Sequence, residues 1–319
     1  MRPTIATTAT ALAQRISVVH LSVAADYWAL TKPEVNFLII VTTGTGFYLG
    51  CPTYLDGLPL VRLIHTLLGT LLIASGAATL NQFVERRFDV QMRRTARRPL
   101  AAGRLEPATV LAFGAALSIA GALYLATAVN ALACLLALLT LTSYLAVYTP
   151  LKRQTPLCTL AGACSGALPT LIGCAAASGR LSVEAWILYA VLFLWQFPHF
   201  MAIAWIHRDD YDRAGYLVLP SAACRSRFVA WQAVLPALAL IPLSLTPTLL
   251  GYADRAYLLG ALPLSSGFAW YAAQLGRRRS NRVARRLLLA SIIYLPVLLV
   301  LMMVEKTCAT VGVLGGTLP

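Results

Sequence analysis

The stretch "VLAFGAALSIAGALYLATAVNALACLLALLTLTSYLAVY", residues 110–148, decides the fold class of this chain. It lies within two apolar runs, at about 107–126 and 129–148. As helices, such runs are long enough to cross the roughly 30 Å hydrocarbon core of a bilayer. Because the gap between them is very short, we expect a tight hairpin of two helices around Val129 and Asn130.

The rest of the chain repeats this apolar pattern. Of its 319 residues, 59% are hydrophobic and 12% are charged, whereas soluble domains are about a quarter charged. We therefore predict an all-α polytopic membrane protein with about nine transmembrane helices. A membrane domain is expected at 28–305, between an N-terminal cytoplasmic tail (1–27) and a C-terminal tail (306–319). The other seven segments are 34–52, 61–83, 156–177, 183–205, 228–250, 256–275 and 286–304.

Positive charge is distributed unevenly over the loops between these segments. With the N-terminus in the cytoplasm, 22 of the 26 Lys and Arg residues fall on the cytoplasmic face. Cytoplasmic loops of membrane proteins carry such an excess. The pattern predicts a cytoplasmic N-terminus and a C-terminus on the opposite side, and it explains the net charge of +14 without a nucleic-acid partner. The opposite face holds Arg62, Arg180, Arg255 and Lys306.

The N-terminal segment has neither a secretory apolar region nor a cleavage site. Arg2, Arg15, several Ser and Thr residues and the lack of any acid before Asp26 resemble an organellar transit peptide. A short cytoplasmic tail fits as well, and we favour it. The expected location is therefore a bacterial inner (cytoplasmic) membrane, with the mitochondrial inner membrane as the alternative.

A polar stretch, "NQFVERRFDVQMRRTARRPL" (81–100), follows the second apolar segment. Asn81, Glu85 and Asp89 are spaced i, i+4, i+8, so they share one face of a helix. Amide and carboxylate oxygens suit Mg²⁺, which commonly shares its coordination sphere with substrate phosphates. We interpret the three as a candidate magnesium site. The alternative is an acid–arginine network on the surface of a helix end.

Basic residues near this stripe are candidates for phosphate binding. Arg94 and Arg98 follow it, and guanidinium groups suit phosphate oxygens. Lys152 and Tyr148 are i, i+4 neighbours at another cytoplasmic edge, where Lys152 is positioned to bind a diphosphate. For each of these cations, the alternative role is only to orient the chain in the membrane.

A second cluster lies at the cytoplasmic end of the segment at 183–205. Pro198 is expected to kink this helix, and His199 is an ionisable residue at membrane depth, which indicates function by default. The alternative for His199 is a hydrogen bond to a neighbouring helix. Two acidic clusters on one face are suited to hold a polyanion through metal ions. The residues that crowd the helix exit are His207, Arg208, Asp209, Asp210 and Asp212.

Several blocks together resemble the UbiA-type intramembrane prenyltransferases. The family motif NxxxDxxxD is similar to Asn81, Glu85 and Asp89, with Glu in the middle position. "LTKPEV" (30–35), "YTPLKR" (148–153) and "GALPTLIG" (166–173) resemble the family's first, fourth and fifth spans, and the resemblance covers roughly 28–305. "PHF" (198–200) and "DDYxRAG" (209–215) point to the members that act on haem. The block RTxxRPLxxG matches Arg94, Thr95, Arg98, Pro99, Leu100 and Gly103.

The resemblance implies a UbiA-like helical bundle that transfers a farnesyl group from farnesyl diphosphate to a vinyl group of haem b, with addition of water. It implies Mg²⁺ as cofactor and the lipid bilayer as surroundings. His199 is then the candidate haem contact, with Trp195, Phe197, Phe200 and Tyr211 lining the macrocycle. The family usually has Asn where this chain has Cys158. The implied metal ligands are Asn81, Glu85, Asp89, Asp209 and Asp210, with Lys152 as a further catalytic residue; the implied substrate-binding residues are Arg94, Arg98, Tyr148, His199, Arg208, Tyr211 and Arg213.

Two other functions remain open from the residues. One is a prenyltransferase that acts on a quinone precursor or another tetrapyrrole. The other is a haem transporter or chaperone, although transporters place their ionisable residues near the membrane midplane, while the acids here cluster at one rim. A downstream enzyme that forms haem A is a candidate partner.

Overall fold

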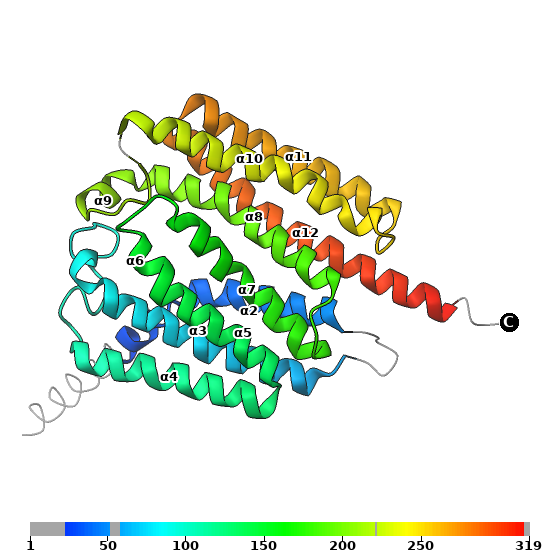
Figure 1. Ribbon diagram of the computed structural model, residues 1–319, viewed down its shortest axis with the longest axis horizontal. Coiled ribbons are helices and arrows are strands. Elements are labelled where there is room, and N and C mark those ends of the chain that lie inside the picture. Colours follow the sequence, from blue (N-terminus) through cyan, green and yellow to red (C-terminus); the bar gives the residue numbers. More distant parts are fainter. Residues whose placement is uncertain (1–22, 52–57, 221, 316–319) are drawn as a thin grey trace, which may run out of the picture.

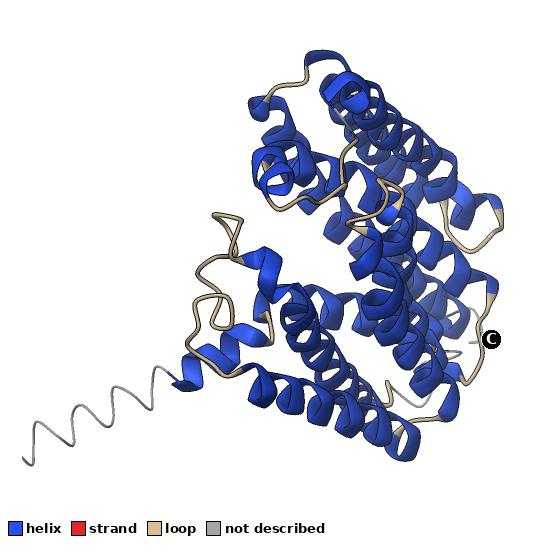
Figure 2. Cartoon of the chain, turned by 60° about the vertical axis from the view of Figure 1, so that its left-hand side comes forward, coloured by secondary structure: helices blue, strands red, loops and turns tan. Residues whose placement is uncertain are grey.

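The computed structural model describes residues 23–51, 58–220 and 222–315, and these residues form only helices and loops (Figure 2). Residues 23–30 are helical and precede the long helices. The all-α prediction is therefore confirmed for the described part of the chain. The elements are α2 (Pro33–Gly50), α3 (Leu60–Asp89), α4 (Pro107–Ala128), α5 (Ala131–Thr142), the π-helix η1 (Ser143–Tyr148), α6 (Thr149–Leu151), α7 (Cys158–Ser178), α8 (Val183–Ile206), α9 (Arg208–Arg213), α10 (Ala222–Leu249), α11 (Arg255–Arg278) and α12 (Asn281–Gly315).

Each of the nine predicted segments overlaps one long helical stretch. In the described ranges, seven of these stretches are long and apolar enough to cross a membrane, so the chain is an integral membrane protein. The other two are α2, which begins with the polar residues Glu34 and Asn36, and α11, which has arginines at both ends. Nine crossings and the side of each terminus stay predictions.

Two helices extend past their predicted ends. Helix α3 continues from the apolar segment through Asp89, so the polar stripe lies on its last turns. Helix α12 runs to Gly315, past the expected domain end at 305. The expected C-terminal tail is therefore helical as far as it is described, and most of the expected N-terminal tail, residues 1–22, lies outside the described residues. Pro198 lies inside α8; its kink stays a prediction.

The segment predicted at 129–148 forms one continuous helical stretch, Ala131–Leu151, but it is not regular α-helix throughout. It is divided into α5, the π-helix η1 and the short α6. Pro150 has no N–H to donate to the carbonyl of Ala146, and its ring would collide with that carbonyl in a regular α-helix. The wider turn is closed instead by the Thr149 N–H, which donates to the Tyr144 carbonyl. Single π-turns inside helices are frequent at functional sites.

The predicted hairpin between α4 and α5 is confirmed. Asn130 caps α5, because its Oδ1 accepts a hydrogen bond from the Ala133 N–H at 2.8 Å. Its Nδ2 donates to the Ala175 carbonyl of α7 at 2.9 Å. One side chain therefore closes the hairpin and ties it to a third helix.

Small residues let α2 and α7 pack closely. A Cβ atom at Gly46 would lie 2.2 Å from the Thr170 carbonyl oxygen, and one at Gly173 would lie 2.0 Å from the Thr43 carbonyl oxygen. Close backbone approach is the usual way for helices to associate in lipid. At Gly162, a Cβ would meet the ring of Tyr148 at 2.8 Å, so glycine also makes room for a residue of the candidate site.

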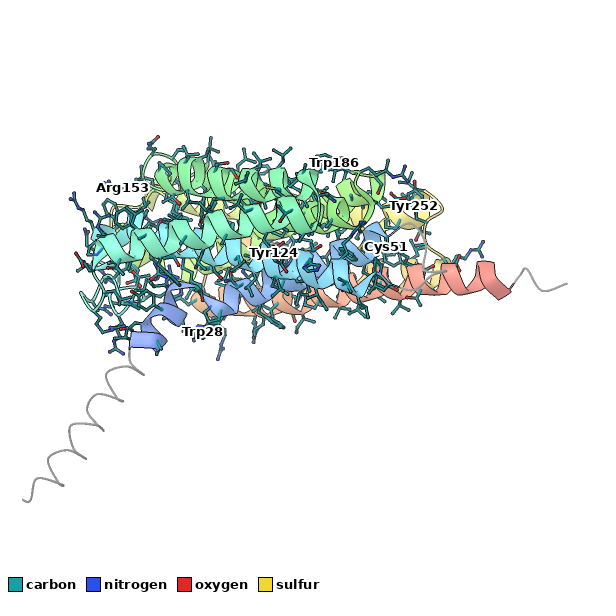
Figure 3. The ribbon with its side chains drawn as sticks, turned by 90° about the horizontal axis from the view of Figure 1, so that it is seen from below. Trp28, Cys51, Tyr124, Arg153, Trp186 and Tyr252 are labelled. Atoms are coloured by element: carbon teal, nitrogen blue, oxygen red, sulfur yellow. The ribbon has the colours of Figure 1, made fainter. Side chains whose placement is uncertain are left out.

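The charge-rich connections gather at one end of the bundle. Figure 1 places the 90–106 loop, α6, α9 and the α11–α12 connection together, away from the α4–α5, α7–α8 and α10–α11 connections. Figure 3 shows Arg153 at the first end and Tyr252 at the other. We call the first the basic end, defined by residues 90–106, 152–153, 207–220 and 277–286. This arrangement agrees with the loop charges of the sequence.

Candidate functional site

The stripe of Asn81, Glu85 and Asp89 lies on the last turns of α3 at the basic end. The three residues are only 1%, 6% and 1% exposed. Their i, i+4, i+8 spacing places them on the face of α3 that points into the protein. An acid–arginine network at this helix end is present in the Asp89–Arg98 pair, but it is buried and does not lie on the helix surface.

Each polar group of the stripe is held by a cation from a different segment. Lys32, just before α2, donates from Nζ to Asn81 Oδ1 at 3.0 Å. Lys152, just after α6, pairs with Glu85 (Nζ to Oε1, 2.7 Å). A buried ion pair is weak evidence for stability because desolvation offsets its attraction. The convergence of three basic residues on one stripe is better explained by a polyanion site. The third pair joins Arg98 to Asp89 Oδ2, also at 2.7 Å.

Two buried polar atoms of this site have room for a further partner. Asp89 Oδ1 is buried and makes no hydrogen bond within the described part of the chain. The Tyr216 hydroxyl is also buried, and its nearest polar interaction is with the Glu85 side chain, outside ideal hydrogen-bond geometry. Burial, followed by the charge of the neighbouring Glu85, raises the pKa of Tyr216. Since buried polar groups are almost always paired in folded proteins, these two atoms fit a bound ligand or cation.

Lys32 belongs to the site although the sequence identifies it only as one of the cytoplasmic charges. Its φ of 52° is in the left-handed region, which is uncommon for a residue with a side chain and is found at functional positions. Because Lys32 precedes Pro33, the right-handed helical conformation is disfavoured for it. Burial, and then the charge of Arg98, lower the pKa of Lys32 to about 7. The Lys-Pro pair at the start of a helix was the available signal.

The π-helix η1 and the first residue of α6 supply further side chains that sequence reasoning missed. Thr149 Oγ1 accepts from Asn81 Nδ2 at 3.2 Å, and the Tyr144 hydroxyl approaches Asn81 Oδ1 at 3.4 Å. The predicted pair of Tyr148 and Lys152 is present, with Nζ 4.4 Å from the ring centroid. The rings of Tyr144 and Tyr148 lie 5.4 Å apart. The turn caused by Pro150 therefore brings two aromatic rings to the stripe.

The acids of the second cluster are neutralised by their own neighbours. Asp210 forms an ion pair with Arg213, and Asp209, whose side chain is 78% exposed, approaches Arg208 at 3.7 Å. Arg208 also donates to Asn281 Oδ1 at 2.7 Å. Within the described ranges, no three His, Cys, Asp or Glu side chains are close enough to hold a metal ion together. Asp209 and Asp210 are therefore at the same end as the stripe but do not complete one ligand set with it.

The chain after α9 links the second cluster to the stripe. The ring of Tyr216 lies 5.9 Å from that of Phe88 on α3 and 6.2 Å from that of Tyr211 on α9. The Leu217 N–H donates to the Lys152 carbonyl at 2.6 Å. Tyr216, which the sequence analysis missed, is therefore one of the residues through which the two clusters touch.

Arg94 lies toward α9. Burial, and then the charge of Arg94, lower the pKa of His207, which directly precedes α9. Among the described residues no ion pair involves Arg94, in contrast to Arg98. The two arginines of the matched block therefore have different positions, one on the stripe and one at the rim.

His199 is on α8 and its side chain contacts α12. Its Nδ1 is 2.8 Å from Ser291 Oγ, and its ring stacks on Trp195 with centroids 4.6 Å apart. Trp195 and Phe197 are buried. The structure brings His199 to a neighbouring helix, and its role as a haem contact stays a prediction.

Cys158 occupies the position where the resembling family usually has Asn. It is 1% exposed at the start of α7. Its Sγ lies 4.0 Å from the Pro156 carbonyl oxygen and also interacts with Thr159. A thiol is a weaker hydrogen-bond donor than an amide, so a different role for this position in this chain stays a prediction.

The sequence of the chain is similar to a known protein family and to individual proteins. A family model described as the UbiA prenyltransferase family matches residues 37–313. The chain is 48% identical over 287 residues to the protoheme IX farnesyltransferase of Solibacter usitatus (strain Ellin6076), covering 88% of this chain and 98% of that protein. It is 42% identical over 291 residues to the protein of the same name from Koribacter versatilis (strain Ellin345), covering 88% and 93%.

Solved structures share the arrangement of helices. A structure described as that of a digeranylgeranylglyceryl phosphate synthase has a TM-score of 0.71 at 15% identity, covering 89% of this chain and 98% of that one. A UbiA homolog from Archaeoglobus fulgidus bound to DMAPP and Mg²⁺ has a TM-score of 0.64 at 15% identity, covering 87% and 99%. At these identities the likeness shows the fold.

Proposed function

This chain belongs to the UbiA prenyltransferase family, and from that premise we propose that it transfers a farnesyl group from farnesyl diphosphate to a vinyl group of haem b, giving haem O. Binding of the diphosphate group is supported by the buried stripe of Asn81, Glu85 and Asp89, in which each residue has a basic partner. Its relatives named protoheme IX farnesyltransferase support the choice of farnesyl donor and haem acceptor.

Lys32, Arg98 and Lys152 bind the diphosphate in this proposal. They converge on the stripe from three segments of the chain, and each has a donor that phosphate oxygens can accept. Arg94, Arg208 and Arg213 add positive charge at the rim, where a polyanion enters. When the diphosphate binds, the three inner cations exchange part of their contact with the stripe for contact with phosphate oxygens.

The stripe fits a divalent cation that is shared with the substrate. Asp89 Oδ1 is buried without a hydrogen-bond partner in the described part of the chain, and Asn81 and Glu85 offer further oxygens beside it. Mg²⁺ usually takes one or two carboxylates and completes its shell with water and phosphate, so two carboxylates suffice. When bound, the ion would neutralise charge on the departing diphosphate. Asp209 and Asp210 would join only by giving up contact with Arg208 and Arg213.

The transfer breaks the bond between the farnesyl C1 and the diphosphate oxygen. A haem vinyl carbon then bonds to C1, and water adds to the resulting cation with loss of a proton. The products are the hydroxyethylfarnesyl haem, diphosphate and that proton. Tyr144 and Tyr148 present aromatic rings near the stripe, and aromatic faces stabilise cations. His199 is proposed as the haem contact and Tyr211 as part of the lining.

We place the protein in the inner membrane of a bacterium, with a haem A-forming enzyme as the consumer of its product. The test of function supplies purified protein in nanodiscs with Mg²⁺, farnesyl diphosphate and either haem b or 4-hydroxybenzoate. Mass spectrometry is expected to find farnesylated, hydrated haem and no prenylated benzoate. Prenylated benzoate without haem O would make the chain a quinone-pathway enzyme. Haem binding with no transfer to either acceptor would favour a transporter or chaperone.

A further inference from the structure

Ser291 on α12 is in hydrogen-bond contact with the imidazole ring of His199 on α8. Ser291 is fully buried. Its Oγ donates to the Leu288 carbonyl at 2.6 Å and lies 2.8 Å from His199 Nδ1. A serine hydroxyl carries one proton and two acceptor lone pairs. The two contacts therefore compete for a single proton.

The shorter contact needs that proton. Two oxygen atoms 2.6 Å apart, one of them a carbonyl, repel each other unless a hydrogen lies between them. The Ser291 proton is therefore directed to Leu288, and Ser291 Oγ is left to accept from His199. In a neutral imidazole, the nitrogen that donates is the protonated one. His199 thus carries its proton on Nδ1, and its Nε2 has a free lone pair.

The orientation of the ring is fixed by Trp195. The two rings are stacked, with centroids 4.6 Å apart and planes inclined by 25°. The Trp195 Nε1–H donates to the backbone carbonyl of the same Ser291 at 2.9 Å. One residue of α12 therefore binds both the imidazole and the indole that packs on it. Among the described residues, the hydrogen bond of the His199 ring is the one at Nδ1.

We propose that Ser291 is a positioning residue that holds His199 in the Nδ1-protonated form, so that Nε2 is available as an axial ligand to the iron of haem. The part that concerns haem rests on the proposed function. Histidines that bind metals commonly donate their second ring N–H to an acceptor, which fixes the tautomer and raises the basicity of the ligating nitrogen. Here the acceptor is a hydroxyl that passes its own proton to a helix carbonyl.

The tautomer can be measured without haem. Solid-state NMR of ¹⁵N-histidine-labelled protein in lipid distinguishes protonated from unprotonated ring nitrogens, and the spectrum of His199→Ala identifies the signals of His199 among the four histidines. We expect Nδ1 protonated and Nε2 unprotonated in the wild type and in Ser291→Thr. A wild-type His199 protonated on Nε2 would overturn the proposal whatever the enzyme's substrate.

Haem binding tests the second part. Titration of the purified full-length protein with haem b, followed by absorption spectroscopy, should give a histidine-ligated spectrum that His199→Ala loses and added imidazole restores. Ser291→Ala should weaken haem binding by about tenfold, the lower end of the usual effect of such outer partners. Ser291→Thr should retain wild-type binding because it keeps the hydroxyl.

Ser244→Ala is the matched control. Ser244 is also a buried serine of the bundle; its hydroxyl bonds the Ile241 carbonyl and Ser265. It should bind haem as the wild type does, and gel filtration should show all variants folded. Equal haem spectra and affinities for wild type, His199→Ala and Ser291→Ala would overturn the proposal. Histidine ligation without any farnesyl transfer would leave the proposal standing and contradict the proposed function.

Discussion

Lys152 and Glu85 form a buried ion pair, with 2.7 Å between Nζ and Oε1, across a separation of 67 residues. The pair joins the end of α6, which follows the π-helix η1, to α3. Its two side chains are 13% and 8% exposed. A pair so far from solvent is costly to form and costlier to break on one side only.

Removing one partner of this pair should therefore reduce stability as well as activity. Lys152→Ala leaves the Glu85 carboxylate buried without its cation, and we expect a loss of about 3–5 kcal/mol in the free energy of unfolding. The double variant Glu85→Gln, Lys152→Met should recover most of that loss and remain inactive. Thermal unfolding in detergent and haem O assays measure the two effects. An active double variant would show that the pair only supports the fold.

Asp89→Asn should abolish turnover in a protein that still folds, although with a lower melting temperature because Arg98 loses its charged partner. The amide keeps the shape of the side chain but removes the charge that holds a cation at the unpaired Oδ1, so we expect at least roughly a 100-fold loss of activity. Asp212→Asn, which alters an exposed acid paired with Arg225, is the control and should remain active. Near-normal turnover in Asp89→Asn would remove Asp89 from the metal site.

Lys32 predicts a pH dependence of diphosphate binding. Its pKa is lowered to about 7, so it is charged below that pH and neutral above it. Binding of a farnesyl diphosphate analogue without metal should therefore weaken as the pH rises through about 7. Lys32→Arg should remove this step, because arginine stays protonated to a pH above about 12. Calorimetric titration measures binding of the analogue by the wild type and by Lys32→Arg at each pH. Identical pH profiles for the two proteins would exclude Lys32 from the site.

The contact between α2 and α7 predicts a steric effect. Gly173→Ala would place a Cβ 2.0 Å from the Thr43 carbonyl oxygen, a backbone atom that cannot move alone. We expect a loss of about 1–3 kcal/mol in stability, as for other overpacked sites. Gly44→Ala is the matched control, because its nearest neighbour outside the helix backbone lies at 3.8 Å. Equal melting temperatures for the two variants would contradict this packing.

The parts of the site that are local in sequence were predictable. Apolar length indicated the helices, and the spacing of Asn81, Glu85 and Asp89 indicated a shared face. Tyr216 depends on the chain returning from α9 to α3, which no short pattern encodes. The pairing of Asp210 with Arg213 was also missed, because a sequence shows acids near arginines without showing which ones neutralise each other.

The π-turn and Lys32 are a different case, since both had a visible signal. Pro150, two residues after the predicted helix end at 148, indicates a broken hydrogen-bond ladder in the turn before it. Lys32 before Pro33 indicates that the backbone at Lys32 is not α-helical, although this rule alone favours an extended conformation and not the left-handed one that is observed. The apolar run before Pro150 indicated a membrane helix, and the charge of Lys32 indicated a cytoplasmic loop. Neither pattern contains the local change in the backbone.

The central claim is that the α3 stripe, with Lys32, Arg98 and Lys152, forms the metal–diphosphate site. The most direct test is anomalous diffraction from crystals grown with Mn²⁺ and a non-cleavable farnesyl diphosphate analogue. We predict a manganese peak bonded to Asp89, with diphosphate oxygens in contact with Arg98 and Lys152. A manganese–diphosphate complex bound elsewhere, with the Asp89–Arg98 and Glu85–Lys152 pairs unchanged, would contradict the account.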